Sequence, residues 1–379
     1  MNRSASSSPS SSFKMDRTKV LKNFWYCASL SKDVKKNQLK STKVLGKNIA
    51  LFRDPIDNNV YCLEDSCPHR NAPLSKGWIE SIESSKNCGE SAKTHIVCPY
   101  HGWSFDRSGK IQHIPSMPRS TPSSKQVLRT YDIEEKDGFV WLFYGSKNVL
   151  EIDRPPIPHI DEFDELDKYD RKRWACAYGE IEIEAPHFNV FDNALDISHI
   201  HYLHSFGNRE SQESQEVRNI CMDDSKGNED ALYSLSGTLD IQNRPINVFW
   251  EWTKIDVVPV RFTAFLPSTS AIKITLGRGV EMITFVHTVP IDQKRSVNRF
   301  CLLRNFARFP LLDYFAERVM LKVLQEDKVM LESLVNPSTN ENENQNQNEN
   351  EISVMTDMPQ IGYRKLWQSW AQLGYLVDL

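Results

Sequence analysis

Two short cysteine–histidine couples constrain this chain more than any other feature of its sequence. The first is Cys67-Pro68-His69-Arg70, and the second is Cys98-Pro99-Tyr100-His101-Gly102-Trp103. Thiolates and imidazoles are good ligands for transition metals, so two such couples can surround one small metal centre. Pro68 and Pro99 favour turns, and each couple is therefore expected at the tip of a hairpin.

Each couple contains one cysteine and one histidine, and this mixture discriminates between metals. A zinc site of the common kind pairs cysteine with cysteine and histidine with histidine. The mixed couples instead suit a [2Fe-2S] cluster, in which one iron takes both thiolates and the other takes both imidazoles. We therefore expect Cys67, His69, Cys98 and His101 to be the cluster ligands. Zinc, or four buried core residues without a metal, are the alternatives.

A second group of acidic and histidine residues lies further along the chain. Asp192, Asp196 and His199 are spaced by four and then three residues, which predicts one face of a helix. His204 is about 140° from His199 on an ideal helix, so both reach one metal only if the helix distorts or ends. Two neutral imidazoles and one carboxylate form the ligand triad of non-haem Fe(II) oxygenases.

The carboxylate of that triad must come from elsewhere in the chain. The segment 311–334 predicts a long helix whose apolar stripe includes Met320 and Leu324, and Asp327 falls on the same stripe. An unpaired carboxylate is costly to bury, and a metal ion would remove that cost. We predict Asp327 as the third ligand and Glu326, about 100° off the stripe, as the second choice. A helix cap or a salt bridge is the alternative role for Asp327.

The chain divides into a short polar start, a β-rich first half and an α+β second half. Residues 1–20 begin with a Ser-rich stretch and are expected to be disordered, with a transit peptide as the alternative. Short aromatic and β-branched runs over 21–150 predict a small all-β domain. The Pro-rich stretch at 154–158 predicts a linker. The second domain spans 151–379, with a polar tract at 337–351 expected to be a disordered loop.

Composition excludes several classes of protein. Lys and Arg number 46 against 50 Asp and Glu, so the net charge of -4 argues against nucleic-acid binding. No run approaches the roughly 18 apolar residues of a membrane span, so we expect a soluble protein. Its expected location is the cytoplasm, or the plastid stroma if the start is a transit-peptide remnant. Eight unevenly spaced cysteines do not suggest a secreted disulfide scaffold.

Together these motifs resemble the Rieske non-haem iron oxygenases. The two couples match the oxygenase form of the Rieske motif, and 192–204 matches the mononuclear iron motif of the same family. One departure is a longer gap between the couples, with the surplus near 83–93. That surplus includes Cys88 and looks like an insertion on a surface loop. The closest branch holds pheophorbide a oxygenase, chlorophyllide a oxygenase and enzymes like vanillate O-demethylase.

The resemblance has several implications for fold and site. It implies an α+β chain, with an N-terminal all-β Rieske [2Fe-2S] domain followed by a helix-grip (START-like) antiparallel sheet. It implies that His199, His204 and Asp327 bind Fe(II), and that Asp196 links the two metal centres. In the family this acid reaches a cluster histidine, here His101, across a subunit boundary. A ring-shaped homotrimer is therefore also implied.

The expected partners follow from the cofactors. The sequence Gly277-Arg278-Gly279 lacks the third glycine of a dinucleotide-binding motif, so electrons should come from a separate ferredoxin or ferredoxin-type reductase. The other co-substrate is O2. Aromatic residues in the second half suggest an apolar cyclic substrate, aromatic or tetrapyrrole-like, that is hydroxylated or oxidatively demethylated. They are Phe249, Trp250, Trp252, Phe262, Phe265 and Phe285. A Rieske electron-transfer protein and a non-catalytic START-like binding module are the alternative functions.

Overall fold

The computed structural model describes residues 18–82, 93–118, 127–146, 148–169, 172–205, 216–223, 232–242, 257–335 and 352–379. The expected insertion with Cys88 and the expected loop at 337–351 lie outside the described residues, as does the Ser-rich start. Lys19 and Val20 belong to β1 (Lys19–Leu21), which pairs antiparallel with β20 (Leu376–Asp378). The disorder expected through residue 20 therefore does not hold for Lys19 and Val20, because they have a strand partner.

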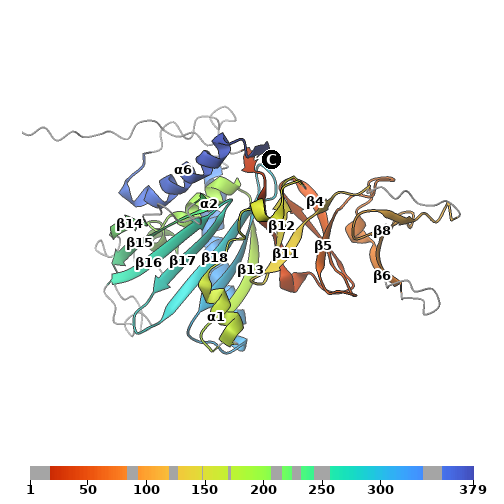
Figure 1. Ribbon diagram of the computed structural model, residues 1–379. Coiled ribbons are helices and arrows are strands. Elements are labelled where there is room, and N and C mark those ends of the chain that lie inside the picture. Colours follow the sequence, from red (N-terminus) through yellow and green to blue (C-terminus); the bar gives the residue numbers. More distant parts are fainter. Residues whose placement is uncertain are drawn as a thin grey trace, which may run out of the picture.

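One seven-stranded antiparallel sheet forms the centre of the second half of the chain (Figure 1). In spatial order its strands are β13 (Ala175–Ile183), β19 (Ser296–Arg304), β18 (Glu281–Pro290), β17 (Thr269–Thr275), β16 (Val257–Phe265), β15 (Ser234–Gln242) and β14 (Val217–Met222). Burial along β16 alternates from Val258 to Ala264, as expected for a strand with two different faces. The expected strand at 246–258 is described only from Val257 onward.

Strand β19 is buried at every position because the sheet is covered on both faces there. On one face, Phe300 packs against Met320 and Leu324 of α5 (Leu311–Val335). On the other face, Cys301 belongs to a larger core shared with the first half of the chain. This double cover explains why the strand reads as a continuous apolar run rather than an alternating one.

Helix α5 buries one narrow stripe, formed by Met320, Leu324, Asp327 and Leu331. Spacings of four, three and four residues keep these side chains on a single helical face. The helix packs mainly along β13 and places Asp327 on the side that faces the protein interior. The other described helices are α1 (Asp161–Tyr169), α2 (His187–Leu195), α3 (Ile200–Leu203) and α6 (Met358–Gln372). Among the described residues, no helix has the length and apolar character needed to cross a membrane.

Three small antiparallel sheets form the first half of the chain. The first holds β3 (Leu39–Val44), β4 (Lys47–Arg53), β5 (Val60–Glu64) and β10 (Thr130–Tyr131); the second holds β2 (Phe24–Leu30), β11 (Ile133–Lys136) and β12 (Phe139–Tyr144); the third holds β6 (Trp78–Ile82), β7 (Lys93–Val97), β8 (Ser104–Asp106) and β9 (Ile111–His113). The fold class expected from the sequence is confirmed, with an all-β first half and an α+β second half built on an antiparallel sheet.

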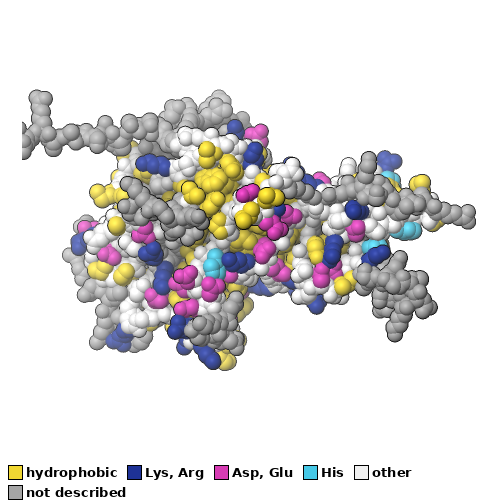
Figure 2. Space-filling model, viewed as in Figure 1, with side chains coloured by type: hydrophobic (Ala, Val, Ile, Leu, Met, Phe, Trp, Pro, Cys, Tyr) yellow, Lys and Arg dark blue, Asp and Glu magenta, His cyan; other side chains and the backbone are white. Residues whose placement is uncertain are grey.

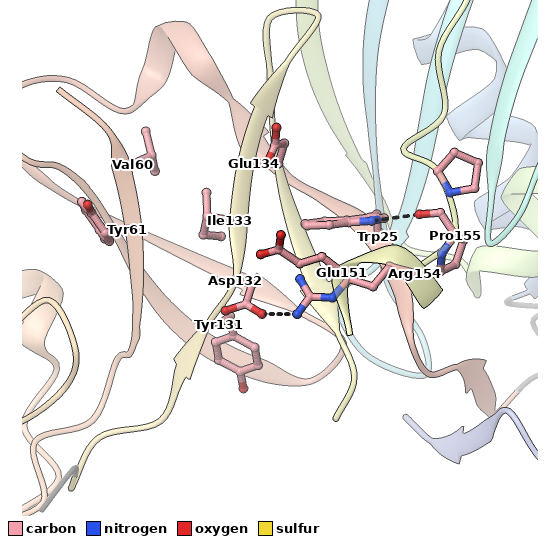
Figure 3. Close-up of a pocket in the computed structure, with 11 residues that line it drawn as sticks. Trp25, Val60, Tyr61, Tyr131, Asp132, Ile133, Glu134, Glu151, Arg154 and Pro155 are labelled. Carbon is pink, nitrogen blue, oxygen red and sulfur yellow. Dashed lines mark hydrogen bonds and ion pairs between the residues drawn. The ribbon is translucent and has the colours of Figure 1, made fainter. Parts of the chain in front are cut away.

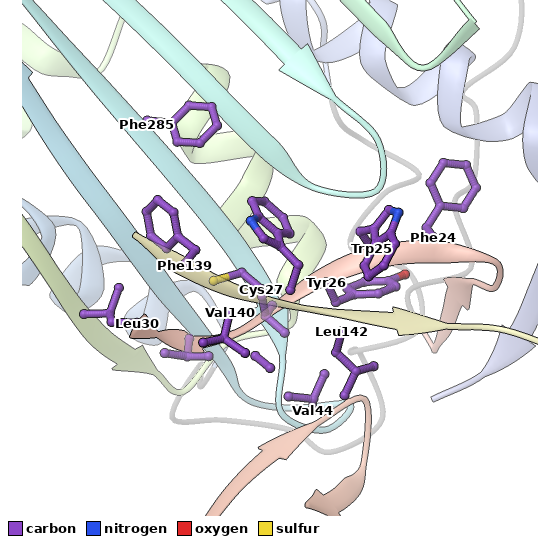
Figure 4. Close-up of a cluster of buried hydrophobic side chains, with 14 of the residues drawn as sticks. Phe24, Trp25, Tyr26, Cys27, Leu30, Val44, Phe139, Val140, Leu142 and Phe285 are labelled. Atoms are coloured by element: carbon purple, nitrogen blue, oxygen red, sulfur yellow. The ribbon is translucent and has the colours of Figure 1, made fainter. Parts of the chain in front are cut away.

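The sheet of β2 and β12 packs directly on the seven-stranded sheet (Figure 4). The ring of Phe139 lies 6.2 Å from that of Phe285 and 4.3 Å from that of His287, measured between centroids. Arg299 donates from Nη1 to the carbonyl of Cys27 at 2.8 Å and from Nε to Glu180 at 2.9 Å. The two halves of the chain therefore share one buried core.

The third small sheet, β6 to β9, forms a lobe whose core includes Cys67, Cys98 and Phe105 and is shared with Phe52 of β4 and Leu63 of β5. Figure 1 shows β6 and β8 at the end of the molecule away from the seven-stranded sheet. The two sequence motifs therefore lie in different parts of the fold.

Candidate metal centres

The two cysteine–histidine couples form two tight turns in the β6–β9 lobe. The Cys67 N–H donates to the Ala72 carbonyl at 2.9 Å, and the Asn71 N–H donates back to the Cys67 carbonyl at 2.7 Å. In the second turn the Cys98 N–H donates to Trp103 at 2.8 Å, and Gly102, at φ +71°, donates to Cys98 at 3.1 Å. The second turn joins the paired strands β7 and β8, as expected for a hairpin tip, whereas the first turn lies between β5 and β6, which belong to different sheets.

The imidazoles of the two couples face each other at the surface of the lobe. The rings of His69 and His101 lie 4.5 Å apart, and Trp103 stacks on His69 at 4.7 Å with an interplanar angle of 6°. His69 Nδ1 is buried and has no hydrogen-bond partner within the described chain. His101 is exposed, and Figure 2 shows histidine side chains on the surface at this end of the molecule. An orphaned nitrogen beside a second imidazole suits a shared metal ion.

The two thiols lie together beneath the imidazoles, each 1 % exposed. Burial, together with the adjacent Cys98 thiol, raises the pKa of Cys67 to about 11. Two buried thiolates would be unstable without nearby positive charge, and bound iron supplies that charge. The grouping of thiol with thiol and imidazole with imidazole fits a cluster with a different ligand pair on each iron.

The histidines of the second motif lie on a broken helix, which corrects one expectation. Helix α2 ends at Leu195, so Asp192, Asp196 and His199 do not share one helix face. The Asp196 carboxylate accepts the Ser198 N–H at 2.7 Å, and this local turn replaces the next helical hydrogen bonds. His199 then precedes α3 and His204 follows it. The spacing of His199 and His204 required a helix that distorts or ends between them, and α3 ends at Leu203, directly before His204.

This break brings both imidazoles to the carboxylate of α5. His199 Nε2 lies 3.3 Å from Asp327 Oδ1, and His204 Nε2 lies 3.5 Å from the same oxygen. One ligand atom from each of the three residues lies within 4.8 Å of the other two. His204 and Asp327 are buried and His199 is mostly buried, so the three groups converge inside the protein. The structure thus brings together three side chains distant in the sequence.

A further carboxylate lies at the other ring nitrogen of each histidine. Asp196 Oδ2 lies 3.6 Å from His199 Nδ1. Glu326 Oε2 lies 3.0 Å from His204 Nδ1 and also accepts the Ser205 N–H at 3.2 Å. Glu326, the second choice as a ligand, therefore faces the opposite side of the His204 ring from Asp327. Only the adjacency of Glu326 to Asp327 in the sequence hinted at this role.

The electrostatics of the triad fit a divalent cation. Burial alone would lower the pKa of His199, but the carboxylates of Asp196 and Asp327 outweigh it and raise the pKa to about 9. Asp327 Oδ1 accepts no hydrogen bond from the described residues, although it is buried. A buried acceptor without a donor is costly, and two imidazoles with one carboxylate are a complete facial ligand set for Fe(II).

Apolar residues surround the histidine segment. Ile197 and Ile200 lie on either side of His199. Ile197 belongs to an apolar cluster, and Ile200 packs against it. The cluster also contains side chains of β14 to β17, among them Phe262. Phe265 and Phe285 pack in the other core, toward the first half of the chain. Of the six aromatic residues expected near the substrate, only Phe262 is on the triad side within the described chain. Phe249, Trp250 and Trp252 lie outside the described residues.

A separate cavity of about 510 Å³ lies where the first half of the chain meets the linker (Figure 3). Arg154 donates from Nη2 to Asp132 at 2.7 Å, and Trp25 Nε1 donates to the Pro155 carbonyl at 3.1 Å. None of the expected metal ligands lines it. These contacts instead fix the Pro-rich linker against the β sheet.

Comparison with known families agrees with both centres. Residues 24–132 match the family described as Rieske [2Fe-2S] domain. Residues 183–373, half of the chain, match the vanillate O-demethylase oxygenase C-terminal domain. The chain belongs to the Rieske non-haem iron oxygenases. A Rieske oxygenase carries a [2Fe-2S] cluster, and its catalytic domain uses a mononuclear iron, in agreement with the cofactors expected from the motifs.

Several curated relatives of this Rieske oxygenase are themselves oxygenases. The oxygenase component of dicamba O-demethylase from Stenotrophomonas maltophilia is 27 % identical over 328 residues, 83 % of this chain and 88 % of that protein. The 4beta-methylsterol monooxygenase of Methylococcus capsulatus is 31 % identical over 185 residues, 48 % of this chain and 44 % of that protein. Chloroplastic chlorophyllide a oxygenase of Chlamydomonas reinhardtii is 28 % identical over 198 residues, 50 % and 26 % of the two chains. The alignment thus spans less than half of the last two relatives.

Solved Rieske oxygenases share the fold of the whole chain. Dicamba monooxygenase bound to dicamba has a TM-score of 0.72 and 20 % identity, with 93 % of this chain and 98 % of that chain covered. Pseudomonas putida CBB5 NdmA with caffeine has a TM-score of 0.69 and 20 % identity, with 93 % and 92 % covered. The arrangement of both halves is therefore that of known Rieske oxygenases.

Proposed function

We propose that this protein is the terminal oxygenase of a Rieske system. It uses O2 and electrons from a ferredoxin or ferredoxin-type reductase to hydroxylate or oxidatively demethylate an apolar cyclic substrate. The observation that carries this proposal is the convergence of His199, His204 and Asp327, whose ligand atoms lie within 4.8 Å of one another. A Rieske protein that only carries electrons, or a START-like binding module, has no need for this triad.

The residues for each metal follow from the site geometry. His199, His204 and Asp327 would hold Fe(II), and Cys67, His69, Cys98 and His101 would hold the [2Fe-2S] cluster. When bound, these two groups supply O2 activation and single-electron storage. The protein supplies the rest. Asp196 Oδ2 lies 3.6 Å from His199 Nδ1, and its negative charge favours a proton on Nδ1, which would leave Nε2 free for the metal.

A second copy of the chain is part of the proposal. In Figure 1, β6 and β8 lie at one end of the chain, well away from α2. Electron transfer between centres that far apart in one copy would be slow, whereas a head-to-tail ring sets the cluster lobe of one copy beside the iron site of the next. In such a ring, a homotrimer by family resemblance, Asp196 would also receive a hydrogen bond from His101 of the neighbouring copy.

Exposed apolar side chains on the cluster lobe and on α5 support the ring. Around the cluster, Tyr100 is 64 % exposed and Trp78 is 47 % exposed. Along the outer side of α5, Leu311, Phe315 and Val319 share one stripe and are each more than half exposed. Large exposed apolar patches usually mark interaction surfaces. Two different patches on one chain are what a heterologous, ring-closing interface requires.

The substrate class rests on the surroundings of the triad. Ile197 and Ile200 flank His199, and Phe262 lies in the same apolar cluster. Dicamba O-demethylase, vanillate O-demethylase and the 4beta-methylsterol monooxygenase are named for cyclic substrates. Of these kinds of substrate, the apolar cluster beside His199 favours one with a large hydrocarbon surface.

A metal and turnover analysis tests the proposal. Purified protein should contain three irons per chain, with a reduced Rieske signal in electron paramagnetic resonance and an O2-dependent product when ferredoxin, reductase and candidate substrates are supplied. Two irons per chain would indicate an electron carrier, and zinc without a Rieske signal would indicate a binding module. In Cys67→Ala or Cys98→Ala protein, a normal Rieske spectrum would refute the cluster assignment.

Location in the plastid stroma, rather than the cytoplasm, is a second point for testing. Its support is the similarity to the chloroplastic chlorophyllide a oxygenase and the acid-poor, Ser-rich sequence of the first fifteen residues. Residues 1–20 fused to a fluorescent protein should direct it to plastids if they are a transit peptide. A diffuse cytoplasmic signal would favour the cytoplasm.

A further inference from the structure

The Glu326 side chain is the one carboxylate at the triad whose role the proposed iron ligands leave unexplained. It directly precedes Asp327 on α5, yet the two side chains address opposite sides of one imidazole. Asp327 Oδ1 lies 3.5 Å from His204 Nε2, and Glu326 Oε2 lies 3.0 Å from His204 Nδ1. The ring of His204 is thus held between two consecutive carboxylates of the same helix.

The contact of Glu326 extends to the backbone. Its Oε2 also accepts the N–H of Ser205 at 3.2 Å. His204 ends α3 with an extended backbone, at φ -84° and ψ 144°, so no helix continues to hold the ring in place. The two hydrogen bonds to Glu326 therefore attach the end of the histidine segment to α5.

A ligand role for Glu326 conflicts with this arrangement. A neutral imidazole carries one N–H and one lone pair, and the nitrogen that donates to a carboxylate cannot also bind a metal. With Nδ1–H facing Glu326, the lone pair of Nε2 faces Asp327. A metal between His199, His204 and Asp327 would lie on the far side of the ring from Glu326.

We propose that Glu326 is a positioning residue, which fixes the tautomer and orientation of His204 so that Nε2 is presented to the iron. The proposal rests on the iron site proposed above. The two iron histidines differ in this respect. Glu326 lies within hydrogen-bond distance of His204 Nδ1, at 3.0 Å, whereas Asp196 lies 3.6 Å from His199 Nδ1. Outer-shell carboxylates of this kind typically contribute about 10–100-fold in metal affinity.

Two substitutions separate positioning from ligation. Glu326→Ala removes the acceptor, whereas Glu326→Gln retains a carbonyl oxygen for His204 and Ser205. Glu317→Ala is the matched control, because Glu317 lies on the same helix and, among the described residues, forms an ion pair only with Lys32, at 3.8 Å. Fe(II) affinity is measured by anaerobic competition with a chromogenic chelator. The tautomer of His204 is measured by nitrogen-15 NMR of the metal-free protein.

We expect the Fe(II) affinity and the tautomer of His204 to change by different amounts in the three variants. Glu326→Ala should bind Fe(II) about 10–100-fold more weakly and gain the Nε2–H tautomer of His204, with the [2Fe-2S] spectrum unchanged. Glu326→Gln should lie closer to wild type in both measurements, and Glu317→Ala should match wild type. Wild-type affinity and tautomer in Glu326→Ala would overturn the proposal. Loss of iron in both Glu326 variants as complete as in Asp327→Ala would instead make Glu326 a ligand. Iron retained both in Asp327→Ala and in the Glu326 variants would refute the iron site itself, which is a separate failure.

Discussion

The Asp192 carboxylate and the Arg364 guanidinium form a two-pronged ion pair, with Nη2–Oδ2 at 2.7 Å and Nε–Oδ1 at 3.3 Å. The pair joins α2 to α6, and the rings of Phe191 and Tyr363 lie 4.4 Å apart beside it. Helix α2 leads directly into the segment that carries the iron histidines. The C-terminal helix therefore fixes the start of that segment without contacting the metal ligands through this pair.

Arg364→Ala should destabilise the protein. Both side chains are about four-fifths buried, so the substitution leaves a largely buried carboxylate without its partner. The expected loss in free energy of unfolding is about 1–3 kcal/mol, measured by urea unfolding. Arg364→Lys keeps the positive charge but not the two-pronged contact of the guanidinium. Its free energy of unfolding should lie between those of Arg364→Ala and wild type. Equal stability of Arg364→Ala and wild type would show that the pair is energetically neutral.

Asp327→Ala should remove the mononuclear iron and abolish turnover. Its Oδ1 is the one oxygen near both imidazoles, at 3.3 and 3.5 Å, and no other described carboxylate joins the triad. The [2Fe-2S] spectrum should remain, because the cluster ligands lie in a different lobe. Iron analysis and electron paramagnetic resonance on the same sample measure both. Retained iron in this variant, with loss in Glu326→Ala, would transfer the ligand role to Glu326.

Asp196→Ala should retain both metals but lose product formation. Asp196 touches His199 at the nitrogen away from Asp327, so its removal leaves the ligand set intact. Asp196→Asn keeps the shape without the charge and should be nearly as inactive. The measurement is the rate at which pre-reduced protein is re-oxidised on mixing with O2 and substrate. A wild-type single-turnover rate in Asp196→Ala would exclude the bridging role.

Phe315→Lys combined with Val319→Lys should break the proposed ring. Both side chains are more than half exposed, so the substitutions cost the single chain little stability. Light scattering should show a trimer for wild type and a monomer for the double variant. The monomer should keep both metals and lose turnover. An active monomer would refute the need for a neighbouring copy.

Acid should destabilise the fold through a buried histidine at the start of α2. Burial lowers the pKa of His187 to about 3, and its Nδ1 has no partner within the described chain. The unfolded chain takes up this proton near pH 6.5, whereas the folded chain does not until about pH 3. Stability is therefore present above pH 6.5 and falls as the pH drops, by about 1.4 kcal/mol per unit.

Urea unfolding at pH 7.5, 6.5 and 5.5 measures this slope. His187→Phe should unfold with a smaller loss of stability between pH 6.5 and 5.5, since the titrating ring is gone. His287 is also buried, and burial lowers its pKa well below the usual value, so part of the slope remains. His113→Ala, at an exposed histidine, is the control. An unchanged slope in His187→Phe would contradict the prediction.

The sequence was most informative where the chemistry is local. Each cluster couple lies within four residues, so Cys67 with His69 and Cys98 with His101 could be recognised from spacing alone. Asp327 could be found because a carboxylate on an apolar stripe conflicts with burial unless a cation is present. That conflict is a physical signal within one helix, and it needs no knowledge of the partner elements.

The sequence was misleading where a side chain competes with the backbone. The period of Asp192, Asp196 and His199 continues through the true end of α2, so periodicity predicts one helix. The stop comes from the Asp196 side chain, which accepts the Ser198 N–H. The partners of Glu326 and Asp192 could not be predicted either, because they lie more than 100 residues away and depend on how α5 and α6 dock.

The core shared by β12 and β18, with Phe139 between Phe285 and His287, has a consequence for recombination between relatives. A chimera cut at the Pro-rich linker would separate two halves of one interior, and each half would have to tolerate an unmatched aromatic surface. The β6–β9 lobe is also not independent, because its core includes Phe52 of β4 and Leu63 of β5. Exchange of the cluster lobe between enzymes of this kind should therefore carry the residues at positions 52 and 63 with it, so that the core around Cys67 and Cys98 stays matched.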